Sequence, residues 1–309
     1  MRLDRFLAAR FPDWSRSKLV RGIKNGEVCD ASGKQLRASL TVREGMILAI
    51  SIPGLAPTTP QPSIPPVVYE DDDVVVLNKP AGLSCHPAGG NFEWAVIGLA
   101  RERWPGIDLV HRLDRDTSGV LVLAKHIEAN RLLKHQFKHA HPDKSYVALV
   151  RGDYEVSGLI DAPIDYGSSV IRIKMAVVPG GPEAQTTVTP REVRTAGDVT
   201  LTWVDCTLHT GRTHQIRVHL AHTGLGIVGD RMYGVPPEVF LTAWEHGVDA
   251  NVVRTAGAPR QALHAHRLAF DLPSGRRTEV VAPIPQDITR WWDDPSVLPM
   301  DGWQPDGPR

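Results

Sequence analysis

The densest group of polar side chains in the sequence is the segment His111–Gly119, which runs directly into the apolar stretch Val120–Ala124. A polar loop that leads into a buried strand is a sound place for reactive groups, because the strand fixes the loop. Within this loop Asp114 lies between Arg112 and Arg115, and neighbouring positive charge favours an ionised carboxylate. Such a group is suited to act as a nucleophile or to stabilise a cation, and poorly suited to donate a proton. The alternative is a turn in which Asp and Thr side chains cap the backbone.

A second polar segment, His209–His222, ends in a predicted helix for which Thr213 is the expected N-cap. Ile216 and Leu220 share one face of that helix through their i, i+4 spacing. Arg217 lies beside this apolar face, so its guanidinium could turn into the core, where it would need an acidic partner. The alternative is an ordinary surface arginine.

Two further segments contain residue types suited to contact with a nucleobase or to a tight turn. In Lys144–Val150 the alternation of a strand puts Tyr146 on one face, where its flat ring could meet a base or simply belong to the core. The segment Asn78–Pro87 is typical of a strand end followed by a turn that contains proline and glycine.

The elements that must hold these segments are mostly strands. Strand-like patterns cover residues 73–77, 120–124, 145–150 and 199–207. Helical spacing covers residues 126–140 and 213–222. The apolar face of the first of these helices is predicted to consist of Ile127, Leu132, Leu133 and Phe137. Strands outnumber helices without a regular alternation, which predicts an α+β fold with a mixed, mainly antiparallel sheet.

A small basic module precedes these segments. Residues 1–52 contain ten Lys and Arg residues and five acids, a net charge of +5 in a chain whose formal net charge is zero. A helix is predicted over residues 2–11, and Ser15 is placed to cap a second helix. The exposed face of that second helix is predicted to present four cations: Arg16, Lys18, Arg21 and Lys24. A basic module on a mildly acidic body is typical of a tethered polyanion binder, and the same charges also suit an ordinary solvated surface.

A proline-rich stretch separates the module from the body. Residues 53–66 contain six prolines, which exclude both helix and sheet ladder and predict a semi-extended linker. We therefore predict a binding module over residues 1–52, a linker over 53–66, a body over 67–288 and a tail over 289–309. The tail, which includes Trp291 and Trp292, contains no residues suited to chemistry.

The polar segments, in this order, resemble the RluA-type family of RNA pseudouridine synthases. The loop HRLDRDTSG and the helix GRTHQIRVH are each long and specific, and KPAGLSCHP, KSYVALV and RQALHA extend the similarity over about residues 67–285. In the module, RLD, SRSK, IKNG and REGM resemble the small α/β S4 RNA-binding domain, although CDASG stands where that domain usually has a VNG-like turn. An S4-like module ahead of the catalytic domain is a common arrangement in this family.

The resemblance implies roles for five residues. Asp114 falls on the catalytic aspartate of the family, and Arg217 falls on the arginine that pairs with it. Tyr146 falls on the tyrosine that stacks on the target uracil and is a candidate acceptor of its C5 proton. Ile216 falls on the apolar residue that packs against the base, and Arg112 on a side chain that helps to displace the flipped nucleotide.

The implied reaction agrees with these residue types. It breaks the C1′–N1 bond of uridine, rotates the base and forms a C1′–C5 bond, so C1′ becomes electron-poor and an ionised carboxylate beside it lowers the barrier. Asp114 could attack C1′ or remove the 2′ hydrogen, and both routes stay open. Asp116 receives no role, because the family does not require an acid there. No redox step or group donor is needed, so no cofactor is expected.

Several other classes of site and location are excluded. Gly224–Gly229 fits the GxGxxG pattern, but a helix precedes it, whereas a dinucleotide site needs a strand there. No metal is expected, since the spacings of the later histidines rotate their side chains away from a common helical face. No run of 18 or more apolar residues and no secretory signal are visible, so no membrane association is expected. Three scattered cysteines without a CxxC pair favour a cytoplasmic protein.

The expected partner is structured RNA, with 23S-type ribosomal RNA or a pre-ribosomal particle ahead of transfer RNA, and the expected state is a monomer. Two rival functions differ in class. A nucleoside or glycoside hydrolase shares the carboxylate beside C1′ but would release free base or sugar. A non-catalytic RNA-binding or ribosome-assembly factor would keep the basic module but would have no use for Asp114, Arg217 and Tyr146.

Overall fold

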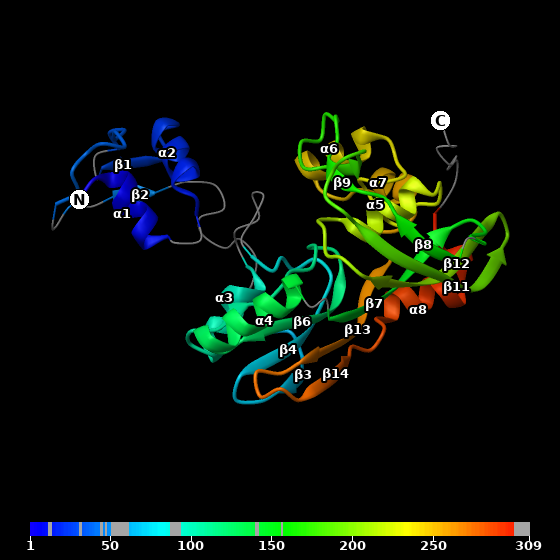
Figure 1. The fold of residues 1–309 in the computed structure, drawn as a ribbon. Coiled ribbons are helices and arrows are strands. Elements are labelled where there is room, and N and C mark those ends of the chain that lie inside the picture. The colour runs from blue at the N-terminus through cyan, green and yellow to red at the C-terminus, as the bar shows by residue number, and fades with distance from the viewer. Residues whose placement is uncertain are drawn as a thin grey trace. The chain divides into compact units, whose positions relative to one another are not determined.

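The computed structural model describes residues 1–11, 14–30, 33–43, 46, 48–50, 62–86, 94–139, 142–155 and 157–299. These form two compact units, one of residues 1–64 and 84–103 and the other of residues 65–83 and 104–309. Figure 1 labels their helices and strands. Most of the predicted linker lies outside the described residues. The first unit also contains residues 84–103, which the sequence placed in the body.

The first unit is built from short elements. Its described helices and strands are α1 (Leu3–Arg10), α2 (Arg16–Lys24), β1 (Val28–Asp30), β2 (Leu48–Ile50) and α3 (Val96–Arg103). Ser15 caps α2 as predicted, with its side chain accepting a hydrogen bond from the backbone N–H of Lys18. Leu19 and Ile23 of α2 pack with Leu3 and Leu7 of α1 in a small apolar core.

An ion-pair cluster links the two helices of this module. Asp4 is only 1% exposed and accepts hydrogen bonds from Arg2 Nε and Arg16 Nε, each at 3.1 Å. These bonds, that of Arg2 first, hold the pKa of Asp4 well below its usual value. Arg16, predicted to face RNA, therefore also holds α2 to α1. Lys18 lies with Nζ 3.9 Å from the centre of the Trp14 ring, whereas Arg21 and Lys24 are exposed.

The second unit contains the remaining elements. Its strands are β3 (Val67–Glu70), β4 (Val74–Lys79), β5 (Asp108–Leu109), β6 (Ser118–Ala124), β7 (Asp143–Arg151), β8 (Gly158–Asp161), β9 (Ile164–Tyr166), β10 (Met175–Val177), β11 (Gln185–Ala196), β12 (Val199–Leu208), β13 (Leu263–Asp271) and β14 (Arg277–Val281). Its helices are α4 (Ile127–His139), α5 (Gln215–His222), α6 (Pro237–His246), α7 (Ala250–Ala256), α8 (Gln286–Asp293) and the 3₁₀ helix η1 (Pro295–Val297).

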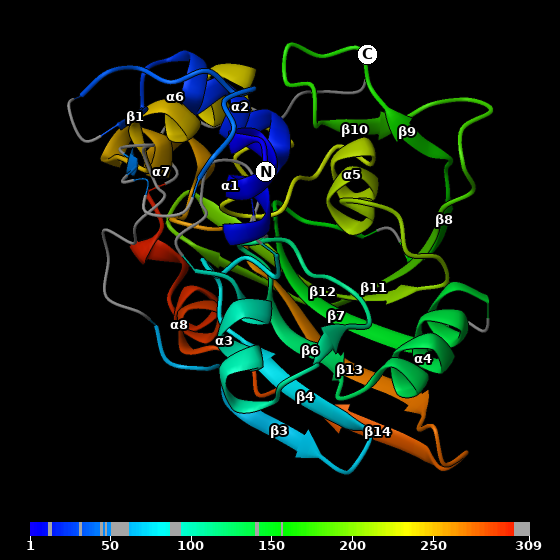
Figure 2. The same ribbon diagram turned by 90° about the vertical axis from the view of Figure 1, so that its left-hand side faces the viewer.

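A ten-stranded sheet forms the body, and Figure 2 shows its central strands in order. The main path runs β3-β4-β6-β13-β7-β12-β11-β8, with β14 paired to β13 and β5 paired to β6. Strands β6 and β13 pair in parallel through Ser118 and Gly119, whereas the other strand pairs described in this sheet are antiparallel. The predicted mixed, mainly antiparallel α+β fold is confirmed. Within the described residues, no helix has the length and apolar content needed to cross a membrane.

Of the four residues predicted to form the apolar face of α4, two are packed in the core and two are exposed. Leu133 is buried and Phe137 packs on the same core as Val120 and Val122 of β6, as expected. Ile127 and Leu132, however, are 79% and 50% exposed. Both residues lie on a different side of the helix from Leu133. The face of α4 that packs on the sheet is therefore narrower than the four predicted apolar positions suggest.

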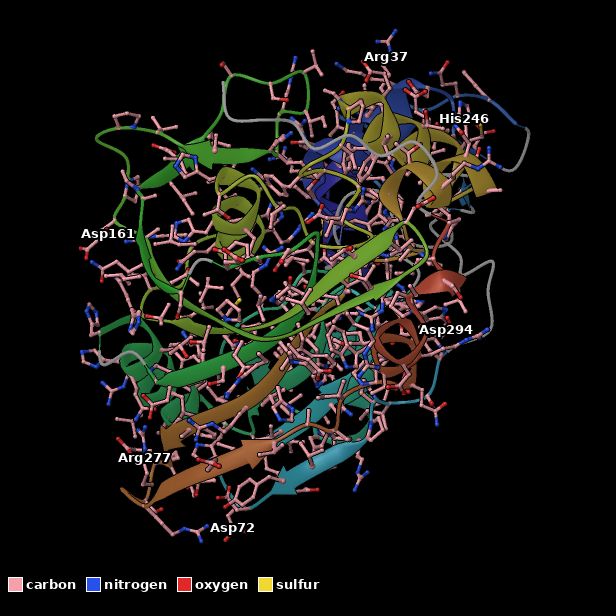
Figure 3. All side chains as sticks on the ribbon, turned by 90° about the vertical axis from the view of Figure 1, so that its right-hand side faces the viewer. Arg37, Asp72, Asp161, His246, Arg277 and Asp294 are labelled. Atoms are coloured by element: carbon pink, nitrogen blue, oxygen red, sulfur yellow. The ribbon has the colours of Figure 1, made fainter. Side chains whose placement is uncertain are left out.

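The predicted boundary between body and tail falls inside helix α8. Trp291 and Trp292 are buried in the same core as Leu201 and Val204 of β12, so α8 packs as part of the body. Asp294, labelled in Figure 3, follows this helix and caps η1 by accepting a hydrogen bond from the backbone N–H of Ser296. These two large aromatic side chains bury apolar surface, so this part of the predicted tail is packed.

Candidate active site

The loop that carries Asp114 is clamped to the end of strand β4. Lys79, the last residue of β4, is fully buried, and its ammonium donates to the carbonyl oxygens of Arg115 at 3.0 Å and Leu83 at 2.9 Å. The backbone N–H of Gly82 donates to the same Arg115 carbonyl at 2.9 Å. The residue next to Asp114 is thus fixed by a strand more than thirty positions earlier, an anchor that no local pattern predicts.

The other side of the loop is held by the segment that enters β13. Gln261 donates to the Thr117 hydroxyl at 2.6 Å, and Ser118 Oγ lies 2.9 Å from His264 Nδ1. Gly119 has φ +118°, and a Cβ added there would lie 2.1 Å from the carbonyl oxygen of Ala265. Only glycine permits this close approach, so the loop and β13 come together at the point where Asp114 must be positioned.

Arg217 joins Asp114 to a second carboxylate, Asp230. Its Nη1 donates to Asp114 Oδ2 at 2.8 Å, whereas Nε and Nη2 donate to Asp230 Oδ2 and Oδ1 at 2.6 and 2.9 Å. The predicted pairing of Arg217 with Asp114 is present, and the guanidinium does turn into the core with its side chain 8% exposed. The bidentate geometry with Asp230 is the stronger of the two contacts.

The sequence motifs do not single out Asp230, which directly follows the rejected glycine motif Gly224–Gly229. Its side chain is fully buried, and Oδ1 also accepts hydrogen bonds from the backbone N–H groups of Met232 at 2.9 Å and Tyr233 at 3.2 Å. The preceding Gly229 has φ +77°, and a Cβ there would lie 1.9 Å from the Arg260 carbonyl oxygen. The one feature of the sequence that pointed to such a residue was the need of a buried Arg217 for an acidic partner.

The charges and donors around both carboxylates favour their ionised forms. Burial by itself would raise the pKa of Asp114, but Arg217, with help from His214 and Arg112, holds it below its ordinary value. Burial would likewise raise the pKa of Asp230, and Arg217 and the backbone donors lower it. Burial opposes the charge of Arg217 too, yet Asp230 and then Asp114 raise its pKa, so the whole triad stays charged at neutral pH.

His214 and Tyr233 complete the surroundings of Asp114. His214 Nδ1 lies 2.9 Å from the Tyr233 hydroxyl, and Nε2 lies 3.8 Å from Asp114 Oδ2. Burial, aided by the charge of Arg217, lowers the pKa of His214 to about 4, so the ring is neutral near pH 7. Burial also raises the pKa of Tyr233, which keeps its phenol protonated.

The start of α5 differs from the prediction. His214, at φ +58°, occupies the N-cap position in place of Thr213, and no side chain caps the helix there. Gln215 organises this end: its Oε1 accepts from the backbone N–H of Arg212 at 2.9 Å and from the Thr210 hydroxyl at 2.8 Å. A buried glutamine that satisfies the loop removes the need for a threonine cap.

The other predicted site residues lie on different elements. Tyr146 is half-buried on β7, in register with Ala265 of β13, which in turn pairs with Gly119 at the end of the Asp114 loop. Ile216 is 4% exposed in a core against which Tyr146 also packs. Arg112 is exposed, and its charge acts on Asp114. Their catalytic roles stay predictions.

This arrangement combines an ionised, 22% exposed carboxylate with rigid cationic support, which suits the stabilisation of positive charge or attack on carbon. The family model described as RNA pseudouridylate synthase matches residues 73–222, a range that contains both Asp114 and Arg217. The ribosomal large subunit pseudouridine synthase D of Xanthomonas campestris is 39% identical over 298 residues, which cover 94% of this chain and 87% of that protein. The chain belongs to the RluA-type family of RNA pseudouridine synthases.

Other comparisons agree with this family. An RNA pseudouridine synthase of Chloroflexus aurantiacus, described as uncharacterized, is 42% identical and covers 93% of this synthase and 87% of its own length. Among solved structures, the human RNA pseudouridylate synthase domain containing 1 is 27% identical, with a TM-score of 0.57 over 70% of this synthase and 82% of that chain. The family resemblance inferred from the motifs is confirmed. The synthase is therefore an isomerase that acts on uridine in RNA.

Proposed function

We propose that this synthase converts specific uridines of large-subunit ribosomal RNA to pseudouridine, with Asp114 as its catalytic carboxylate. The observation that carries the proposal is the ionised Asp114 fixed by Arg217 in a site whose other carboxylate is fully buried. The choice of ribosomal RNA is supported by relatives named as ribosomal large subunit pseudouridine synthases over more than nine-tenths of this chain.

The reaction requires that Asp114 act where positive charge develops on the sugar. As the C1′–N1 bond breaks, its electron pair leaves with the uracil, and C1′ becomes electron-poor. In one route a carboxylate oxygen bonds to C1′ and is later displaced by C5; in the other it takes the 2′ hydrogen as a proton. In both, C5 finally loses a proton, and Tyr146 is the proposed acceptor. The ionised state of Asp114 serves either route.

The remaining residues of the site are proposed to hold the nucleotide. A base inside a helix cannot react, so the target uridine must be flipped out, and Arg112 is exposed where it can take its place. Tyr146 and Ile216 are proposed to contact the uracil, with a stacked base contributing roughly 1–3 kcal/mol. Arg217 is proposed to keep Asp114 ionised and oriented throughout.

The N-terminal module is proposed to be an S4-like RNA tether. Arg21 and Lys24 on α2 are exposed, and cations on one helix face suit phosphate contacts, which supply affinity without reading sequence. Because Arg16 also pairs with buried Asp4, we expect Arg21 and Lys24 to contribute more of the salt-dependent affinity than Arg16 does.

The activity is tested with the purified full chain and an unmodified large-subunit ribosomal RNA transcript that contains uridine tritiated at C5. Formation of the C1′–C5 bond displaces tritium from C5, and sequencing of the modified sites identifies the uridines. The expected result is tritium release at a few positions without free uracil. Release of free uracil would favour a hydrolase, and modification of transfer RNA alone would overturn the choice of substrate.

The tether is tested by deleting residues 1–66 and by the double variant Arg21→Gln/Lys24→Gln. Both should weaken RNA binding and flatten the dependence of log Kd on log salt, by about one unit of slope per lost phosphate contact. Arg290→Gln, an exposed arginine of α8, is the matched control and should leave the slope unchanged. Equal affinity and slope for the truncated and full chains would exclude the tether.

We further propose that the synthase works as a monomer in the cytoplasm. Cys29, Cys85 and Cys206 are free thiols, which supports a reducing compartment. Light scattering with and without RNA tests the first point, and localisation of a tagged full chain tests the second.

A further inference from the structure

The two oxygens of Asp114 have different surroundings. Oδ2 accepts the hydrogen bond from Arg217 Nη1 at 2.8 Å, and the same oxygen faces His214 Nε2 at 3.8 Å. Within the described part of the chain, Oδ1 accepts no hydrogen bond from a side chain or backbone group. One oxygen is therefore held by the protein, and the other is left available.

The far side of the His214 ring is fixed by Tyr233. The Tyr233 oxygen accepts a hydrogen bond from the backbone N–H of Met175 at 3.0 Å, and it lies 2.9 Å from His214 Nδ1. The two rings meet edge to face with centroids 5.7 Å apart. Tyr233 is in turn covered by Arg217, whose guanidinium carbon lies 5.0 Å from the ring centroid. His214 therefore has little freedom to rotate.

These contacts select one tautomer of the neutral imidazole. If Nδ1 carried the proton, the lone pair of Nε2 would point at the negative Asp114 Oδ2. If the Tyr233 hydroxyl donates to Nδ1, the proton sits on Nε2 and the N–H dipole faces the carboxylate, which is the favourable arrangement. The charged and titratable groups around this ring are Asp114, Arg217, Asp230, Arg112 and Tyr233.

The backbone of His214 supports a specific role. At φ +58° and ψ +17° it is the only residue other than glycine with positive φ in the described chain. A non-glycine residue in this region costs energy and is found at functional sites more often than elsewhere. The conformation turns the ring back toward Asp114 from the position three residues before Arg217, so one short segment supplies both groups that face Oδ2.

We propose that His214, oriented by Tyr233, is a positioning residue that directs an Nε2–H toward Oδ2 of Asp114 and thereby leaves Oδ1 as the oxygen that reacts at the ribose. The separation of 3.8 Å between His214 Nε2 and Asp114 Oδ2 is longer than a hydrogen bond, and catalytic hydrogen bonds often shorten only in the substrate complex. This inference rests on the proposed function of Asp114.

The test compares single-turnover rates and RNA affinity for three variants on the tritiated large-subunit ribosomal RNA transcript. His214→Asn suits the left-handed backbone, but its shorter side chain has no N–H at the position of Nε2. This variant should lower the rate about 10- to 100-fold with unchanged Kd. His214→Gln, whose amide nitrogen can replace Nε2–H, should recover most of the rate. Tyr233→Phe keeps the ring over Arg217, removes the hydroxyl, and should lower the rate less than His214→Asn.

A double variant separates a relay from a structural effect. His214→Asn/Tyr233→Phe should be no slower than His214→Asn alone, because Tyr233 acts through His214. The acid limb of the rate against pH should also shift upward in His214→Asn, since Asp114 loses a donor that favours its ionised form. His222→Asn, an exposed position on the same helix, is the matched control.

The outcomes distinguish this inference from the proposed function. If the wild-type chain fails to modify the transcript, the proposed function fails before any variant is compared. If the wild type is active but His214→Asn keeps its rate and acid limb, or the two substitutions simply add, His214 does not position Asp114 and the inference is overturned.

Discussion

Arg217 lies between two aspartates that differ in how completely they are hydrogen-bonded and buried. Asp230 has a fully buried side chain, takes two donors from Arg217 and two from the backbone, and has no exposed surface for a substrate. Asp114 is 22% exposed and takes one donor from Arg217. We therefore expect incomplete hydrogen bonding and access to substrate, and not pairing with arginine alone, to distinguish the catalytic carboxylate.

The comparison also separates two physical roles within one ion-pair network. A saturated, buried carboxylate anchors the guanidinium, because an unpaired charge at that depth would be strongly unfavourable. The anchored guanidinium then has one remaining edge with which to hold Asp114 ionised. Asp230 is therefore expected to matter for stability, and Asp114 for the reaction.

The largest expected effect is the loss of activity on Asp114→Asn. The amide is nearly isosteric but cannot stabilise a developing cation or attack carbon, so the single-turnover rate should fall about 1,000-fold or more. RNA affinity and the free energy of unfolding should change little, since Arg217 keeps its bidentate partner. Turnover within tenfold of wild type would remove Asp114 from the centre of the mechanism.

The second prediction concerns Asp230→Asn, which should behave in the opposite way. Loss of this buried charge leaves Arg217 without its main partner and should lower the free energy of unfolding by about 3–5 kcal/mol, measured in urea. Asp198→Asn, an exposed carboxylate in the turn between β11 and β12, is the matched control and should have almost no effect. A cost for Asp230→Asn no larger than that of the control would contradict the anchoring role.

A third prediction measures how strongly each aspartate is coupled to Arg217. Double-mutant cycles of Arg217→Ala with Asp230→Asn and with Asp114→Asn should both be non-additive, by about 0.5–3 kcal/mol, and the first coupling should be larger. Arg217→Lys should preserve the charge but not the planar fork, and so lose stability mainly through Asp230. Equal couplings would erase the distinction between anchor and reactive group.

The smallest expected effect is on how the free energy of unfolding depends on pH, through His214 beside Asp114. His214, facing Asp114, has a pKa lowered to about 4, below the ordinary value of 6.5, so the unfolded chain binds its proton first as pH falls. The contribution of His214 to the free energy of unfolding should therefore be fully present above about pH 6.5 and decline toward pH 4. Burial also lowers the pKa of His264 to about 4, which adds to this decline. His214→Asn should make that decline shallower in urea titrations at several pH values. An unchanged slope would mean that His214 is not buried as a neutral ring.

Some of this molecule follows from local sequence alone. Alternation predicted β7 and β12, and spacing predicted α4 and α5, because each depends on neighbours within a few residues. The ionised state of Asp114 was predicted from its neighbours Arg112 and Arg115, but the main cause that lowers its pKa is Arg217, 103 residues away. Local pattern gave the wrong prediction at positions that depend on tertiary contacts. Thr213 does not cap α5, because Gln215 satisfies the loop, and Ile127 is exposed, because the sheet covers only part of α4.

The sequence by itself identified Asp114 and Arg217 as the pair to examine, but only the tertiary structure decided what surrounds them. Asp230 is thirteen residues from Arg217, Lys79 is thirty-six residues from Arg115, and the Asp114–Arg217 contact joins positions 103 residues apart. Such contacts depend on how strands pair across the sheet and on glycines at which two backbones meet, as at Gly119 and Ala265. Residue types and spacing are local properties, whereas the partner of a buried charge is whichever group the completed core places beside it.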